Sequence, residues 1–130
     1  MTHNFKRFPE LKDSQMPMYY FDSPHRQIKE SFMARVIQVT DGDTIKVLWR
    51  ERDFDFPIRL ARIDAVELAD KGERARDFLA ERILDEEVYI IINPKNRVGK
   101  FGRLIGDVIH FGQSMSQVML DLNYAVPFGK

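Results

Sequence analysis

The strongest constraint on this fold is a change in the spacing of apolar residues along the chain. Three segments alternate apolar and polar residues as β-strands do, a segment with helical spacing follows, and two more strand-like runs come after it. The strands that this pattern predicts are 32–39, 44–51, 55–64, 87–93 and 103–111. The helices that it predicts are 67–87 and 114–123, the second with Ser114 as its N-cap.

This order of elements predicts an α+β fold that is mainly a β-barrel. Hairpin-linked strands, a helix and two further strands suit a five-stranded OB-fold-like Greek-key barrel with two to three helices. A doubly wound sheet would instead need strands and helices that alternate along the chain.

The chain divides into an N-terminal arm, residues 1–31, and a barrel domain, residues 32–130. At 130 residues the chain is most simply one domain with one core. The arm holds three of the six prolines and shows no periodicity, yet it is too aromatic for a typical disordered tail. Two interpretations stay open, an arm that packs on its own domain and an arm that docks on a partner protein.

Composition excludes several kinds of site. The chain has no cysteine, so a disulfide scaffold, a thiolate zinc site and a cysteine nucleophile are excluded. Lys+Arg and Asp+Glu both number 20, so affinity for nucleic acid must come from local placement of charge. No apolar run has membrane-spanning length, and "MTHNFKRFPELKD" lacks the apolar core of a signal peptide. We therefore expect an intracellular protein that does not contact membrane.

Two groups of acidic residues stand at the ends of predicted strands. In "VTDGDTIKV", Asp41 and Asp43 flank Gly42, and Asp-Gly is also a strong signal for a simple hairpin turn. Asp64 closes the third strand, and Glu67 follows where acids favour a helix N-terminus. A hard divalent cation takes several oxygen ligands, often from separate segments. Asp43 and Asp64 could supply them if the two strand ends meet.

Basic residues suggest a site for phosphate. Arg59 lies inside the third strand, and Arg103 follows the turn "GKFG". An arginine among apolar residues usually forms a salt bridge, but two arginines near paired carboxylates can also clamp a phosphate bidentately. Lys95, Arg97 and Lys100 would add a local basic patch for nucleic acid.

Three motifs together resemble the staphylococcal nuclease family, with its bacterial and phage members. They are "VIQVTDGDTIKV", "IRLARIDAVE" and "GKFGRLIGDV", in that order, with the first predicted helix between the second and third. The resemblance covers roughly Ala34 to Phe128. It implies calcium-dependent, largely sequence-nonspecific hydrolysis of phosphodiester bonds in DNA or RNA, leaving 3′-phosphate ends.

The resemblance also implies a calcium site. Asp43 and Asp64 match the family's calcium-binding aspartates, and Ala65 matches the residue that contributes its backbone carbonyl. Asp41 matches an acid that shapes the site without binding the ion, and Thr44 is expected beside it.

The remaining matches concern the reaction itself. Glu67 matches the glutamate that positions or deprotonates the attacking water, and Arg59 and Arg103 match the arginines that hold the scissile phosphate. Val66 and Phe101 depart from the family, which commonly has proline and tyrosine there. The alternative is a catalytically weak or inactive module, which binds nucleic acid or serves as a structural subunit of a larger assembly, such as that of a phage.

Overall fold

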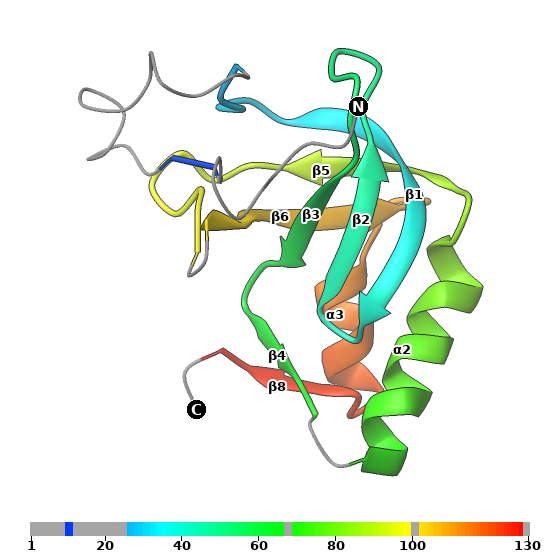
Figure 1. Ribbon diagram of the computed structural model, residues 1–130. Helices are drawn as coiled ribbons and strands as arrows, with labels where there is room; N and C mark the ends of the chain where they lie inside the picture. Colours follow the sequence, from blue (N-terminus) through cyan, green and yellow to red (C-terminus); the bar gives the residue numbers. More distant parts are fainter. Residues whose placement is uncertain (1–9, 12–25, 67–68, 100–101, 129–130) are drawn as a thin grey trace.

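The computed structural model describes residues 10–11, 26–66, 69–99 and 102–128. Its strands and helices follow one another from Phe32 to Pro127 (Figure 1). They are β1 (Phe32–Asp41), β2 (Thr44–Leu48), β3 (Phe56–Leu60), β4 (Ile63–Ala65), α2 (Ala69–Ile83), β5 (Glu87–Ile91), β6 (Leu104–His110), β7 (Gln113–Ser114), α3 (Met115–Asp121) and β8 (Ala125–Pro127).

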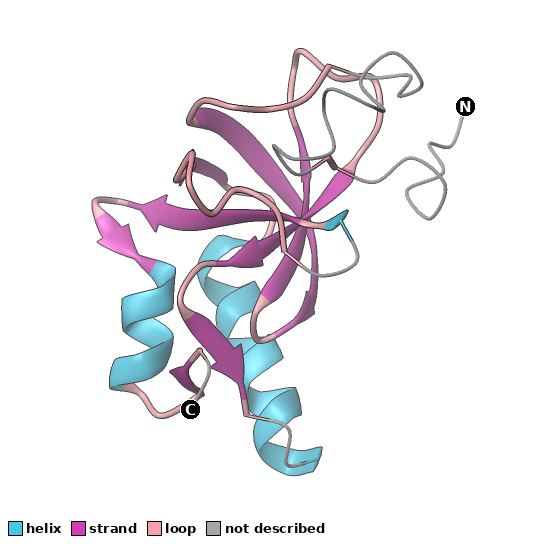
Figure 2. Cartoon of the chain, turned by 90° about the vertical axis from the view of Figure 1, so that its left-hand side faces the viewer, coloured by secondary structure: helices cyan, strands magenta, loops and turns pink. Residues whose placement is uncertain are grey.

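Five strands form a closed barrel, in the order β3-β2-β1-β5-β6. Neighbours in this order run antiparallel, and a parallel pairing of β3 with β6 closes the barrel, with Arg59 opposite Ile105. The helices α2 and α3 lie at the end of the barrel where β1 turns into β2 (Figures 1 and 2). The predicted α+β barrel is therefore confirmed.

The third predicted strand, 55–64, is wrong as a single element, because the chain turns between β3 and β4. Arg62 has φ 70°, a left-handed conformation that a strand does not allow. β4 leaves the barrel and pairs with β8, so that Asp64 lies opposite Val126. This corner lets Arg59 and Asp64 approach each other although they belong to different sheets.

The predicted helices are observed with shorter bounds. α2 ends at Ile83, and Asp85 follows with φ 64°. The helix buries Ala75, Leu79 and Ile83, as its spacing predicts. Ser114 caps α3, because its side-chain oxygen accepts a hydrogen bond from the backbone N–H of Gln117 at 3.3 Å.

The core fills the barrel and the space between the barrel and the helices. Its largest fully buried apolar side chains are Phe56, Ile45, Ile58, Leu60, Ile63, Leu79, Ile83, Ile90, Leu104, Met115 and Met119. Ile28, from the arm, is buried in the same core. None of the helices in the described ranges is long and apolar enough to cross a bilayer.

Candidate active site

The turn between β1 and β2 packs tightly against α2 and β4. Asp41 pairs with Thr44 across the hairpin, and the carboxylate of Asp41 accepts the backbone N–H of Asp43 at 3.0 Å. Gly42 does not have a positive φ, so the turn conformation does not require glycine. A Cβ at Gly42 would stand 3.0 Å from the Cβ of Ala75 and 3.2 Å from that of Ala65. Glycine is therefore needed because the hairpin tip approaches its neighbours closely.

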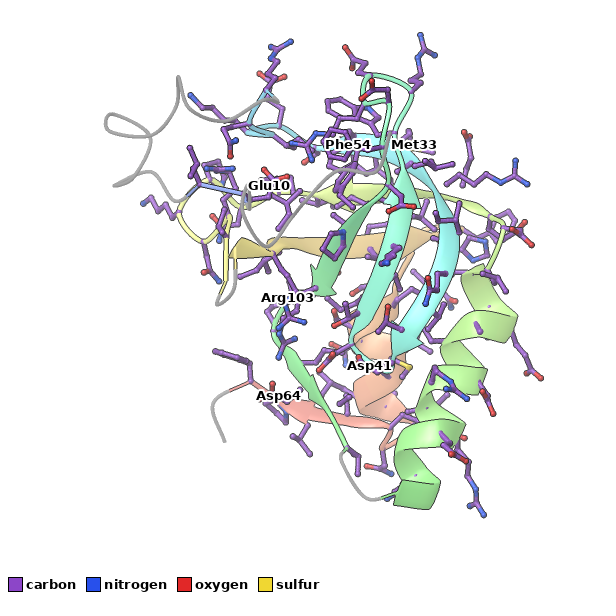
Figure 3. The ribbon with its side chains drawn as sticks, in the orientation of Figure 1. Glu10, Met33, Asp41, Phe54, Asp64 and Arg103 are labelled. Atoms are coloured by element: carbon purple, nitrogen blue, oxygen red, sulfur yellow. The ribbon has the colours of Figure 1, made fainter. Side chains whose placement is uncertain are left out.

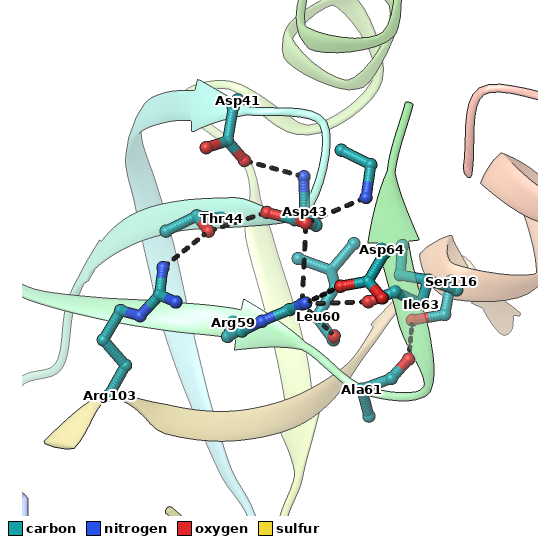
Figure 4. Close-up of polar contacts among 11 residues, drawn as sticks. Asp41, Asp43, Thr44, Arg59, Leu60, Ala61, Ile63, Asp64, Arg103 and Ser116 are labelled. Atoms are coloured by element: carbon teal, nitrogen blue, oxygen red, sulfur yellow. Dashed lines mark hydrogen bonds and ion pairs between the residues drawn. The ribbon is translucent and has the colours of Figure 1, made fainter. Parts of the chain in front are cut away.

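Asp43 is held by donors from three elements (Figure 4). The Thr44 hydroxyl donates to its Oδ1 at 2.9 Å, and the backbone N–H of Ala65 donates to its Oδ2 at 2.9 Å. Arg59 Nη1 lies 3.6 Å from the same Oδ2. The Asp43 side chain is 15% exposed, so it is fixed in orientation and still open to solvent on one side.

One guanidinium joins the two aspartates of the predicted calcium site. Arg59 donates through Nη2 to Asp64 Oδ1 and through Nη1 to the carbonyl of Ile63 at 2.9 Å. The antiparallel register of β2 and β3 places Arg59 opposite Thr44, directly beside Asp43. The corner after β3 then returns Asp64 to the same guanidinium. The structure thus brings together residues that stand far apart in the sequence.

Arg103, the residue directly before β6, joins the same cluster. Its Nη1 donates to Thr44 Oγ1 at 3.3 Å, and that hydroxyl in turn donates to Asp43. Thr44 therefore links Arg103 to Asp43, and Arg59 links Asp43 to Asp64, as Figure 4 shows.

The paired acids at the turn have opposite pKa shifts. Burial and a hydrogen bond with Asp43 raise the pKa of Asp41 to about 6. Burial also acts to raise the pKa of Asp43, but hydrogen bonds from Asp41 and the Ala65 N–H, with the charge of Arg59, hold it below its usual range. Asp43 is therefore the acid of the pair that loses its proton first as pH rises, which suits a metal ligand.

A cavity of about 370 Å³ opens over the carboxylates. It is lined by Thr40, Asp41, Gly42, Asp43, Asp64, Ala65, Val66, Gly72, Glu73 and Arg76. The sequence did not single out Thr40, in β1, or Glu73 and Arg76, in α2. The two charged residues look like part of an ordinary solvated helix face. Arg59 faces a second cavity, of about 360 Å³, where the Phe128 ring lies 5.4 Å from its guanidinium carbon.

The donor chemistry of the first cavity suits a hard cation. Asp43, Asp64 and the Ala65 backbone offer only oxygen atoms, the ligands that calcium prefers, and calcium can complete its shell with water. No group of three acidic or histidine side chains within the described ranges is arranged to hold an ion.

Four predicted residues remain to be placed, Glu67, Lys95, Arg97 and Lys100. Glu67 and Lys100 lie outside the described residues. Arg97 is 4% exposed and donates to the carbonyls of Leu11 and Ile28, the latter at 2.8 Å. It therefore adds no surface charge, contrary to the predicted basic patch, in which Lys95 is exposed.

Comparison with known proteins finds a similarity to a nuclease. The chain is 37% identical over 78 residues to a micrococcal nuclease of Shigella flexneri. The match covers 59% of this chain but only 42% of the relative. No family model matches the chain.

Proposed function

We propose that this chain is a calcium-dependent nuclease of the staphylococcal nuclease family, which hydrolyses phosphodiester bonds of DNA or RNA to 3′-phosphate ends with little sequence preference. The observation that carries the proposal is the cluster of Asp43, Asp64, Arg59 and Arg103 beside an open acidic cavity. The similarity to a micrococcal nuclease supports it.

The arginines have the chemistry that this reaction needs. Phosphodiester hydrolysis requires a water aimed in line, a carboxylate that takes its proton, and positive charge near the developing phosphorane. Arg59 and Arg103 would bind the phosphate oxygens, and Glu67 stays the predicted base. Calcium, when held by Asp43, Asp64 and the Ala65 carbonyl, would supply further positive charge.

Substrate binding requires one exchange of partners. Arg59 Nη2 is hydrogen-bonded to Asp64, whose side chain is 40% exposed. A phosphate that takes this Nη2 donor would replace the carboxylate of Asp64, which lines the cavity and would then be released toward an ion. We therefore propose that Arg59 holds Asp64 before substrate arrives and holds phosphate afterwards.

The test is cleavage of single- and double-stranded DNA and RNA, each with calcium and with chelator. Cleavage should need calcium, and products should resist polymerase extension until a phosphatase removes the 3′-phosphate. Arg103→Ala should lower kcat about 10²–10³-fold, the usual effect of losing one donor to the transition state. Arg82→Ala is the matched control, because Arg82 is exposed on α2 and bonds Gln113.

Three outcomes would contradict the proposal. They are no calcium-dependent cleavage, full activity in Glu67→Gln, and full activity in Arg103→Ala. Binding of nucleic acid without cleavage would favour the inactive module or structural subunit instead. Docking of a partner protein by residues 1–31 and an intracellular location stay predictions from the sequence.

A further inference from the structure

We infer that the arm positions Arg103, through an arm latch formed by Glu10, Leu11, Arg52 and Arg97. These would be positioning residues, which do not touch substrate themselves. The inference rests on the proposed role of Arg103 in binding phosphate. It goes beyond the family resemblance, which begins near Ala34 and does not include the arm.

The latch is anchored by a buried ion pair. Arg52 Nη1 lies 2.6 Å from Glu10 Oε1, with the side chains 4% and 1% exposed. Arg52 also donates to the carbonyl of Arg26 at 2.8 Å and lies over the Phe56 ring at 4.5 Å. A charge pair removed from water in this way is costly to break by losing one partner, so it fixes Glu10 firmly against the barrel.

The anchored arm then holds the connection between β5 and β6 at two points. The Glu10 N–H donates to the carbonyl of Gly102, directly before Arg103, at 2.8 Å. The Arg97 guanidinium, in the middle of the same connection, donates to the carbonyl of Leu11. The Ile105 N–H, in β6, donates to the Arg97 carbonyl at 2.8 Å and so ties this connection to the strand that follows it. The backbone on both sides of the turn that delivers Arg103 is therefore tied to the arm.

The position of this turn decides where the Arg103 guanidinium lies. Figure 3 shows Arg103 between Glu10 on one side and Asp41 and Asp64 on the other. Its side chain reaches Thr44 at 3.3 Å, at the edge of the carboxylate cluster. A misplacement of about 1 Å in a reacting group can cost about 10²-fold in rate, so a loosened turn should lower kcat.

The experiment is a double-mutant cycle on the full chain, with Arg97→Lys and Arg103→Ala. Lysine keeps the charge of Arg97 but lacks the planar fork that reaches two carbonyls at once. We expect Arg97→Lys to lower kcat about ten-fold with Arg103 present, with little change in KM, and less than about two-fold in Arg103→Ala. Arg82→Lys is the control, since it makes the same change at an arginine that bonds Gln113 far from the latch.

Amide hydrogen exchange gives a readout that does not need activity. The Gly99 amide donates to the Arg103 carbonyl, and the Ile105 amide donates to the Arg97 carbonyl. Arg97→Lys should speed hydrogen exchange at these two amides relative to the amides of β1. If wild-type protein does not cleave nucleic acid, the proposed function fails, and exchange alone decides whether the latch holds the turn.

Two results would overturn the latch. One is that Arg97→Lys lowers kcat by the same factor in the wild-type and the Arg103→Ala protein, because a general folding defect would affect both proteins alike. The other is unchanged exchange at Gly99 and Ile105. If Arg97→Lys does not fold, Glu10→Gln serves in its place, since it keeps an acceptor for Arg52 and should give the same pattern.

Discussion

Replacing Gly42 by alanine tests the close approach of the β1–β2 turn to its neighbours. The new Cβ would lie 3.0 Å from the Cβ of Ala75, 3.2 Å from that of Ala65 and 3.6 Å from the Cε of Met119. Carbon atoms in optimal contact lie about 3.5–4.0 Å apart, so the first two distances force the hairpin or α2 to move by several tenths of an ångström.

The expected magnitude follows from two opposing effects. Overpacking of this size costs about 1–3 kcal/mol of folding free energy. Alanine restricts the unfolded chain more than glycine does, which favours the folded state by about 0.4–1 kcal/mol. This gain applies here because Gly42 has no positive φ, so its backbone conformation suits alanine. We expect a net loss of about 1–2 kcal/mol. Under the proposed function cleavage should fall as well, because Asp43 is the next residue.

Urea unfolding followed by fluorescence measures this loss. Trp49 is the single tryptophan, and its ring packs 4.8 Å from that of Phe32 in the barrel. The matched control is the same substitution in an Ala75→Gly background, where the nearest clash is gone and the cost of Gly42→Ala should shrink. The close packing would be refuted if the unfolding free energy of Gly42→Ala lay within about 0.5 kcal/mol of wild type and the effect of Gly42→Ala were the same with Ala75 and with Ala75→Gly.

Three further predictions concern stability. Gly106→Ala should cost more than Gly42→Ala, because its Cβ would overlap Ile90 Cγ2 inside the barrel, and Ile90→Ala should restore part of the loss in urea unfolding. Ser114→Ala should cost about 1 kcal/mol in thermal unfolding, since α3 loses its N-cap and Asp107 loses a donor; no loss would exclude the cap. Asp41 has its pKa raised from 3.8 to about 6, so its contribution is complete at low pH and is lost as pH rises through about 6. As pH rises from 3.8 to about 6, the Tm of metal-free wild type should therefore fall relative to that of Asp41→Asn. Tm profiles that run parallel over this pH range would contradict the prediction.

The barrel was predictable because its strands are long enough to show a period. β1, β2 and β6 have five to ten residues, and alternation is recognisable over such lengths. β4, β7 and β8 have two or three residues, too few for a period to be seen. They form because partners elsewhere in the chain supply their hydrogen bonds, and Ile63, where the alternation breaks, is the local sign of the corner.

The candidate site was predictable in its residue types but not in its connections. Asp43 and Arg59 become neighbours through the β2–β3 register, which places Arg59 opposite Thr44. The burial of Arg97 could not be foreseen, because its acceptors are main-chain carbonyls 69 and 86 residues away. A lone arginine in a turn-rich segment looks the same whether it faces solvent or holds an arm.

The parallel pairing of β3 with β6 has a consequence for the order in which the proposed site is assembled. It joins residues 58–60 to 104–106, so it is among the contacts of greatest sequence separation in the barrel. Contacts of this kind carry a large loop-closure cost and slow folding. Arg59 is one of the paired residues of β3, and Arg103 lies directly before the paired residues of β6. A chain emerging from the ribosome therefore cannot assemble both proposed phosphate-binding arginines until β6 has been synthesised and the barrel has closed.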